Sequence, residues 1–233
     1  MPWLGYFHKL ASADVMVILD NVAYSRGDFV NRNQILSSGG PSYITVPISN
    51  FKSGTPINAI EISGAEWKLN HLAKIRSSYS KANYFNEIFD GISEILTNTK
   101  SVSISTLDVE LINYFIKLLG LKTKLIYQSE LPIMSSGSKL IEDICKHFSA
   151  DAYISGPQGL DYLDIAAFES SSTELVFQEY IHPEYRQQSK RFIEKLSIID
   201  LLFEEMPNAL DILLTRESRF LSVEEKKAAD FGR

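Results

Sequence analysis

The sequence has a single cysteine, Cys145, among 233 residues, so no disulfide can form within the chain. A chain without disulfides fits a reducing compartment, and we expect this protein in the cytoplasm. Cys145 falls in a helical spacing of apolar residues, which favours a buried hydrophobic role over that of a nucleophile. The four histidines lie far apart in the sequence. They do not form the spacing of a zinc site, so we expect no metal.

Long apolar runs and an excess of positive charge are also missing. No apolar run approaches the ~18 residues that a membrane-spanning helix needs, and no signal peptide is visible. The formal net charge is -6 and the pI is about 5.3, whereas nucleic-acid binding needs clustered Lys and Arg. We therefore expect neither a membrane span nor a nucleic-acid partner. The composition, 45% hydrophobic and 22% charged, is that of a globular protein.

Apolar runs of strand length alternate with helical patterns along most of the chain. This alternation predicts an α/β fold with a mainly parallel sheet flanked by helices, and with a helical C-terminal portion. We expect one domain over residues 1–215 and a charged, flexible tail over 216–233. The predicted helices cover 4–11, 67–79, 83–97, 108–119, 139–148, 198–203 and 209–215, and the predicted strands cover 15–19, 42–48, 57–62, 123–127, 152–155 and 176–180.

A polar stretch follows the first predicted strand. Asp20 ends that strand, and Arg26, Asn31, Arg32 and Asn33 come after it in what we predict as a loop. Ligands of open α/β sheets bind at the carboxyl ends of strands. A guanidinium group suits phosphate or carboxylate, and Asn amides can hydrogen-bond a sugar hydroxyl or a base edge. We interpret these five side chains as substrate-binding. The alternative is a loop held by its own side chains.

Two glycine-containing segments are further candidates. Ser155, Gly156 and Gly159 follow a predicted strand, with Tyr162 close behind, and glycines there let a ligand approach the backbone. We include these four residues among the predicted substrate contacts, with a plain turn as the alternative. The segment 135–139, Ser-Ser-Gly-Ser-Lys, begins a predicted helix, where backbone N–H groups can hold an anion. A helix start capped by serine explains it equally well.

Histidine is the side chain best suited to general acid–base catalysis near neutral pH. His71 lies on a predicted helix with Trp67, and His182 precedes Pro183 in a predicted loop. We predict these two as the catalytic candidates, whereas His147 fits a surface position on a helix. A histidine that only makes structural hydrogen bonds is the alternative for each. The residues do not point to a cofactor or to an oligomeric state.

An ordered set of segments carries a family resemblance. The chain resembles the WbqC-like family of bacterial proteins, and the matching segments span most of its length in the expected order. These segments are PWLGYFHKLASADVMVILDNVAYS from Pro2, FVNRNQI from Phe29, YITVPI from Tyr43, W-x-x-x-H from Trp67, SYSKANYF from Ser78, YISGPQGLDYLD from Tyr153, HPEYRQ from His182 and LSIIDLLF from Leu196.

The resemblance implies a pathway. The family occurs in O-antigen and related surface-polysaccharide gene clusters, which implies an enzyme acting on an activated sugar. Some members are described as acyl or glycyl transferases to amino sugars. We therefore expect a transferase that moves an acyl or aminoacyl group onto a nucleotide-linked amino sugar. The arginines of the polar stretch would hold phosphate, its Asn and Asp side chains would orient the sugar or nucleotide, and His71 or His182 would take the proton from the amine.

The opening segment suggests a second reading and one departure from the family. Its Pro-x-x-Gly-aromatic pattern is similar to the entry of HIGH-type nucleotidyltransferases, which would imply an ATP-dependent adenylating enzyme, although Tyr6 stands where those enzymes carry His. A non-catalytic partner that binds a nucleotide sugar is a third hypothesis. Family members usually begin with a short Ile-x-Gln-Pro-x-Tyr-like strand. Met1 stands in its place here, so we expect that strand to be missing.

Overall fold

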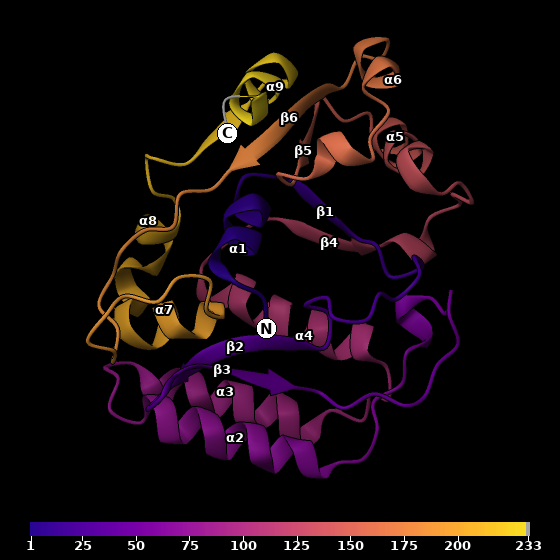
Figure 1. Cartoon of the computed structure of the whole chain (residues 1–233). Helices are drawn as coiled ribbons and strands as arrows, with labels where there is room; N and C mark the ends of the chain where they lie inside the picture. The colour runs from indigo at the N-terminus through magenta and orange to yellow at the C-terminus, as the bar shows by residue number, and fades with distance from the viewer. Residues whose placement is uncertain (232–233) are drawn as a thin grey trace. The chain divides into compact units, whose positions relative to one another are not determined.

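The structure is a computed structural model in which residues 1–231 are described, so the last two residues of the predicted tail lie outside the described residues. The described chain divides into two compact units (Figure 1). The single domain expected over 1–215 stays a prediction. Unit 1 consists of residues 1–127 and 182–214, and unit 2 consists of residues 128–181 and 215–231.

Unit 1 holds two small sheets among its described residues. In the first, β1 and β4 are parallel, with Val15 opposite Lys124. In the second, β2 and β3 form an antiparallel hairpin. The elements of unit 1 are α1 (Leu4–Ala11), β1 (Val15–Ile18), β2 (Arg32–Ser37), β3 (Gly40–Thr45), η1 (Ile57–Ala59), α2 (Glu66–Tyr79), α3 (Phe85–Asn98), α4 (Ile104–Leu118), β4 (Lys124–Tyr127), α7 (Ile198–Glu205), η4 (Met206–Asn208) and α8 (Ala209–Leu213).

The hairpin corrects the prediction of a polar loop around Asn31. Arg32 and Asn33 begin strand β2, and Ser37 pairs with Gly40 across a two-residue turn. Gly40 has a φ of 108°, a conformation that side chains other than glycine rarely adopt. The polar residues at the start of β2 do not predict a strand. Whether so short a segment forms a strand depends on its pairing with a neighbouring strand more than on its residue propensities.

The predicted strand over 57–62 is also wrong. Residues 57–59 form the short helix η1, and Glu61 and Ile62 make only isolated bridges, to Ser103 and Ile48. Alternating apolar and polar residues suggested a strand here, but only Ile60 of this segment is buried. Its carbonyl accepts a hydrogen bond from the amide of Ile104. Helix and short strand are hard to separate over so few residues.

Aromatic side chains form much of the core of unit 1. Phe7 of α1 meets Phe115 of α4 edge-on, with ring centroids 5.9 Å apart. Phe203 of α7 contacts both Tyr79 of α2, at 5.0 Å, and Phe85 of α3, at 5.3 Å. These rings are almost fully buried and tie α7 to the helical layer that carries the hairpin.

Unit 2 contains a three-stranded sheet in the order β5-β6-β7. β5 and β6 are parallel, and β7 is antiparallel to β6. The region expected as a charged tail contains strand β7 and helix α9. Leu221 of β7 and Val223 of α9 are buried. The elements of unit 2 are η2 (Gln128–Glu130), α5 (Gly137–His147), β5 (Ala152–Ser155), η3 (Gly159–Asp161), α6 (Ile165–Glu169), β6 (Glu174–Glu179), β7 (Arg219–Leu221) and α9 (Val223–Phe231).

The α/β class predicted from the sequence is confirmed, including parallel strand pairing and a helical C-terminal portion. The parallel pairs lie in two different sheets, β1-β4 and β5-β6, within the described part of the chain. Most helices match their predicted ranges to within one or two residues, and α1 matches at both ends. Within the described residues, no helix is long and apolar enough to cross a membrane.

Candidate functional site

A groove in unit 1 is lined by residues of β3 and of helix α2, with the segment 63–65 between them. Its volume is about 540 Å³, which falls in the usual range for small-molecule sites. One face of α2 supplies side chains at helical spacing, and the strand supplies aromatic and backbone groups. The residues used below are Tyr43, Thr45, Glu66, Trp67, Asn70, His71 and Lys74.

Two side chains of α2 cap the free edge of β3. The Nζ atom of Lys74 donates to the carbonyl of Tyr43 at 2.6 Å, and Nε2 of His71 lies 3.1 Å from the carbonyl of Thr45. β3 pairs with β2 on one side only, so these carbonyls would otherwise be unpaired in the groove. Capping of an exposed edge is a structural role for both side chains. It also places their polar ends inside the groove.

The contact with Thr45 determines the protonation of the His71 ring. A carbonyl oxygen can only accept, so Nε2 carries the proton and Nδ1 keeps its lone pair. His71 is 7% exposed. Burial lowers the pKa of His71 to about 4, and the positive charges of the Met1 amino group and of Lys74 act in the same direction. The ring is therefore neutral at pH 7, and Nδ1 can accept a proton.

Trp67 forms the wall next to His71. The two rings meet edge-on with centroids 5.0 Å apart. Trp67 is 6% exposed, and its Nε1–H is buried without a hydrogen-bond partner among the described residues. A buried donor left unpaired is costly. A ligand or water with an acceptor oxygen would remove that cost.

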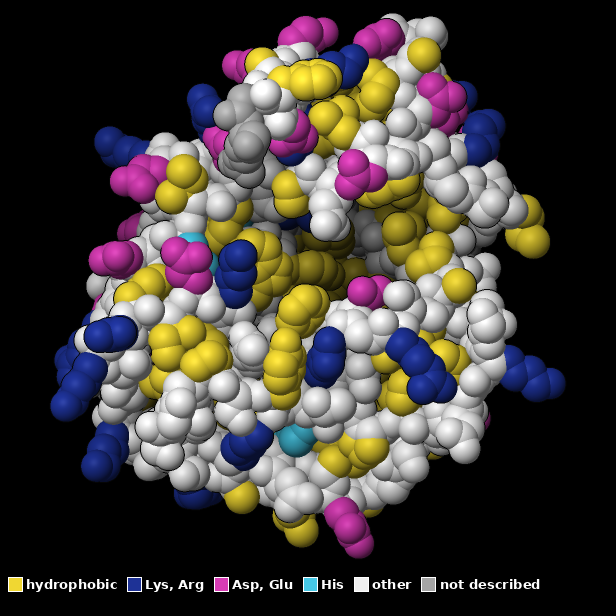
Figure 2. Space-filling model, in the orientation of Figure 1, with side chains coloured by type: hydrophobic (Ala, Val, Ile, Leu, Met, Phe, Trp, Pro, Cys, Tyr) yellow, Lys and Arg dark blue, Asp and Glu magenta, His cyan; other side chains and the backbone are white. Residues whose placement is uncertain are grey.

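Basic and apolar side chains lie side by side over this part of the molecule. On the face that Figure 2 shows, Lys and Arg side chains alternate with hydrophobic ones around the hairpin and α2. Lys74 and Asn70 offer donors, Glu66 offers a carboxylate, and Tyr43 offers an exposed ring. Such a mixture suits a ligand that combines hydroxyls, a ring and negative charge.

The structure brings four of the predicted site residues together. Asn31, Arg32, Asn33 and His71 all line a second, much smaller cavity, which shares Trp67 with the groove. Its volume of about 20 Å³ has room for about one water molecule. The cavity is too small for a substrate.

The amides of Asn31 and Asn33 are used within the fold. Asn31 accepts from the hydroxyl of Tyr24 at 2.9 Å and donates to the carbonyl of Val46 at 2.9 Å. Asn33 donates to the carbonyl of Met1 at 2.7 Å and accepts from the amide of Gln34. These bonds hold the start of the hairpin, as the alternative interpretation of the polar stretch suggested.

Asp20 and Arg26 lie in the segment between β1 and β2. Asp20 is buried and accepts from the side-chain amide of Asn58 at 3.3 Å. The guanidinium group of Arg26 is exposed and lies 4.7 Å from the centroid of the Phe51 ring. Neither residue lines the groove in the described part of the chain.

The remaining predicted substrate contacts belong to unit 2. Ser155 is fully buried at the end of β5, and a Cβ atom on Gly159 would lie 2.0 Å from its Oγ. The absence of a side chain at Gly159 thus lets its backbone pack closely against Ser155. Gly156 has open space around it, and Tyr162 is 55% exposed. Their role as substrate contacts stays a prediction.

No serine side chain of the segment 135–139 caps α5 by a hydrogen bond, but the side chains of this segment are used within the fold. The hydroxyl of Ser135 donates to Asp143 at 2.8 Å, and Lys139 forms an ion pair with the same carboxylate. Ser138 accepts from the amide of Asp164 at 2.8 Å. Because the carboxylate of Asp143 already binds Ser135 and Lys139, an anion would be only weakly attracted to the start of α5.

His182 takes part in a different arrangement in unit 1. Its Nδ1 lies 3.0 Å from the carbonyl of Pro183, and burial lowers its pKa. Three residues further on, Tyr185 donates to Oδ2 of Asp200 on α7 at 2.8 Å, and Gln187 donates to the same oxygen at 2.8 Å. The HPEYRQ and LSIIDLLF segments are therefore hydrogen-bonded to each other.

Asp200 is a buried carboxyl group with few compensating charges. It is 0% exposed, and its Oδ1 atom has no hydrogen-bond partner in the described part of the chain. Burial raises the pKa of Asp200 to about 6 despite the hydrogen bonds from Tyr185, Tyr79 and Gln187, and the nearby carboxylate of Glu204 raises it further. Perturbed carboxyl groups of this kind occur both at functional sites and in structural networks.

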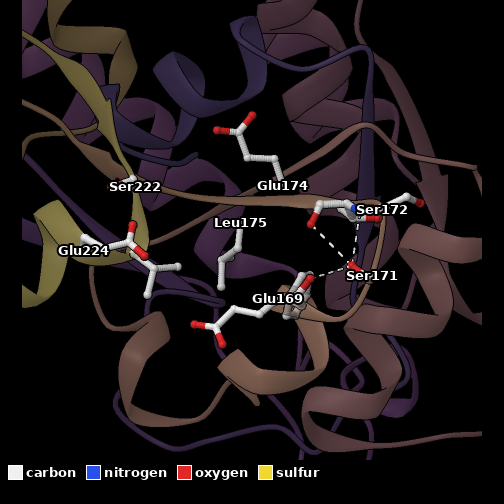
Figure 3. A pocket seen from close by; sticks show the side chains of 10 residues that line it. Glu169, Ser171, Ser172, Glu174, Leu175, Ser222 and Glu224 are labelled. Atoms are coloured by element: carbon white, nitrogen blue, oxygen red, sulfur yellow. Dashed lines mark hydrogen bonds between the residues drawn. The ribbon is translucent and has the colours of Figure 1, made fainter.

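Unit 2 has a pocket of its own, of about 370 Å³ (Figure 3). Glu169, Glu174 and Glu224 lie around it, with Ser172 and Ser222 among the other lining residues. Within the described residues, no group of three or more His, Cys, Asp or Glu side chains could hold a metal ion. The pocket offers negative charge and hydroxyls, and it lacks the basic groups that a phosphate would need.

Sequence reasoning identified His71 and missed its neighbours in the groove. Tyr43, Asn70 and Lys74 were not among the predicted site residues. The signal for two of them was present in the spacing of Trp67, Asn70, His71 and Lys74, which share one face of a helix. Tyr43 joins them only because β3 lies against that face.

The protein is an α/β protein whose groove combines an exposed aromatic ring, a carboxylate and an ammonium group. The chain belongs to the WbqC-like protein family, whose model matches residues 1–212. It is also similar to a Mycobacterium tuberculosis protein named "Uncharacterized protein Rv1507c", at 30% identity over 215 residues, which covers 91% of this chain and 93% of that protein. No solved structure matches the chain.

Proposed function

We propose that this protein is a cytoplasmic transferase that moves an acyl or aminoacyl group onto the amine of a nucleotide-linked amino sugar. It would act in the assembly of a bacterial surface polysaccharide such as O-antigen. Membership of the WbqC-like family supports the pathway. The observation that carries the chemistry is the neutral ring of His71, a residue that lines a groove large enough for a substrate.

Acyl transfer to an amine needs a proton acceptor. The amine nitrogen attacks the carbonyl carbon of an activated acyl donor such as a thioester. A C–N bond forms and the bond from that carbon to the leaving group breaks. The proton lost by nitrogen passes to Nδ1 of His71 and then to the leaving group. A pKa of about 4 keeps the ring neutral at pH 7, so that Nδ1 holds a lone pair, but it makes His71 a weaker base than an unperturbed histidine.

The groove also has groups for the rest of the substrate. The ammonium of Lys74 would neutralise a phosphate of the nucleotide, since it keeps donors beyond its bond to the carbonyl of Tyr43. Asn70 and Glu66 would bond sugar hydroxyls from the same helix. The roles that we expected for Arg32 and Asn31 thus pass to side chains of α2.

Thermal unfolding with candidate ligands tests this proposal. A UDP-, GDP- or dTDP-linked amino sugar should raise the unfolding midpoint, because a ligand that binds only the native state stabilises it. Lys74→Met should abolish that shift, whereas Lys146→Met, an exposed lysine on α5, should preserve it. His71→Gln should retain binding and lose at least ~100-fold in acyl transfer. His147→Gln, at an exposed position, is the matched control.

Three outcomes would contradict the proposal. If none of the nucleotide sugars raises the unfolding midpoint, a nucleotide-linked amino sugar is not the substrate. A shift with ATP alone, with pyrophosphate release, would favour the adenylating alternative. Binding of a nucleotide sugar with no transfer and no effect of His71→Gln would favour a non-catalytic partner.

A further inference from the structure

An exposed aromatic ring stands at the edge of the groove. Tyr43 is 43% exposed, although it lies in the middle of strand β3. Eight other aromatic side chains of unit 1 are buried, and Phe29 is exposed like Tyr43. An exposed ring in a concave, polar setting offers a flat apolar surface with a negative face, which suits stacking with a ligand.

Two cations from different elements hold Tyr43 in place. The ammonium of Lys74 binds its backbone carbonyl at 2.6 Å. The guanidinium carbon of Arg32 lies 4.9 Å from the centroid of its ring, an arrangement that attracts the cation to the ring face. A ring fixed at backbone and side chain loses little further freedom when a ligand stacks on it.

Arg32 approaches the ring from outside the groove. It hydrogen-bonds the carbonyl of Gly27 and is not among the groove-lining residues, whereas Tyr43 is. The guanidinium thus lies over the ring of Tyr43 without lining the groove, whereas the tyrosine lines it. Arg32 supports the ring instead of reaching a phosphate in the groove.

We propose that Tyr43 is the stacking platform for the sugar ring of the substrate, with Arg32 as its positioning residue. This inference rests on the proposed function. C–H groups on the apolar face of a pyranose carry partial positive charge and would meet the negative face of the tyrosine ring. Lys74 binds at the same residue of β3, so the phosphate next to the sugar would lie beside it.

The register of β3 gives the orientation of the substrate. His71 bonds Thr45, two residues along the strand from Tyr43. Two residues of an antiparallel strand span ~7 Å. A sugar stacked on Tyr43 would then extend its amino substituent toward Nδ1 of His71, while its phosphate remains at Lys74. A nucleobase on Tyr43 would instead place the amine far beyond His71.

Calorimetric titration of three probes tests the platform. The probes are UDP-glucosamine, glucosamine 1-phosphate and UDP, each titrated into wild type, Tyr43→Leu and Tyr43→Phe. Tyr43→Leu should weaken both sugar-bearing probes by about tenfold and leave UDP unchanged. Tyr43→Phe keeps the ring and should bind all three as wild type does. Circular dichroism confirms that each variant is folded.

The outcomes separate this inference from the proposed function. Equal binding of all probes to Tyr43→Leu and wild type overturns the platform and leaves the proposed function intact. Loss of UDP binding in Tyr43→Leu, with glucosamine 1-phosphate unaffected, also overturns it, because the base would then occupy the ring. If wild type binds neither sugar-bearing probe nor any GDP- or dTDP-linked amino sugar, the proposed function fails and the platform fails with it.

The role of Arg32 has its own test. Arg32→Met should weaken the two sugar-bearing probes several-fold without changing UDP binding, and Arg32→Lys, which keeps a cation near the ring, should restore part of the loss. If Arg32→Met weakens UDP as much as UDP-glucosamine, then Arg32 binds phosphate and is not a positioning residue for Tyr43.

Discussion

Asp200 is a single residue whose burial is unfavourable for its ionised carboxyl group. Its carboxyl group is fully buried on α7, and Tyr185 and Gln187 both donate to its Oδ2 atom. The pKa of about 6 in the folded protein lies above the value of 3.8 for an unperturbed aspartate. In the unfolded chain the group would lose its proton at lower pH.

This difference predicts a pH-dependent stability. Between about pH 4 and pH 6 the folded protein holds a proton that the unfolded chain has released, so stability falls as pH rises through this window. At pH 7 the full loss is about 3 kcal/mol. Asp200→Asn keeps the shape and an acceptor for Tyr185, so urea unfolding at pH 7.5 should show a more stable protein with a flatter pH profile between 4 and 6.

Asp90→Asn on the exposed side of α3 is the matched control and should change neither quantity. A less stable Asp200→Asn variant at pH 7.5 would contradict this explanation, because it would mean that the ionised carboxylate is favourable in the folded state. If Asp200→Asn is stabilised and acyl transfer falls, the buried carboxyl group has a functional role beyond the bonds it makes.

At the scale of elements, helices α3 and α4 meet through a glycine. A Cβ atom on Gly91 would lie 2.3 Å from the hydroxyl oxygen of Tyr114 and 2.5 Å from a ring carbon. That hydroxyl donates to the carbonyl of Ile88 at 3.0 Å. The glycine is in the middle of α3, where alanine would be favoured by ~1 kcal/mol on helix propensity alone.

Two effects therefore oppose each other in Gly91→Ala. The ring of Tyr114 must move and its hydrogen bond must break, at a cost of about 1–3 kcal/mol. We expect the variant to be less stable by about 1 kcal/mol, measured by urea unfolding. In a Tyr114→Leu background the same substitution should be stabilising, because only the propensity remains. The same sign in both backgrounds would contradict the close contact between the helices.

The elements also show what could be predicted from the sequence. Helices with long periodic patterns, such as α1 and α2, were predicted to within one residue at either end. Strand β2 was missed, because its opening residues Arg32 and Asn33 are typical of a loop and become a strand only through pairing with β3. Local patterns identify helices well and short paired strands poorly.

The candidate site follows the same division. His71 could be selected because histidine on a helix next to Trp67 is visible in the sequence. Lys74 could have been selected too, because it shares the helix face of His71. Tyr43 could not, because its role depends on β3 lying against α2, which is far away in the sequence. The amides of Asn31 and Asn33, predicted as ligand groups, have partners in the backbone that no spacing reveals.

On the scale of the whole molecule, the groove belongs to one compact unit. Every residue that we assign to substrate binding or proton transfer lies in unit 1, and the acidic pocket lies in unit 2. The net charge of -6 gives the molecule no general attraction for anions. A nucleotide-linked sugar would therefore depend on the local positive charge of Lys74.

The central claim is that His71 faces a bound nucleotide-linked amino sugar with an unprotonated Nδ1. Nitrogen-15 NMR of the four histidine rings tests it most directly, before and after titration with UDP-glucosamine at pH 7. We predict a neutral His71 with its proton on Nε2, and a shift of its Nδ1 resonance on saturation while that of His147 stays unchanged. A His71 ring that is protonated at pH 7, or that does not respond to saturating ligand, would contradict the account.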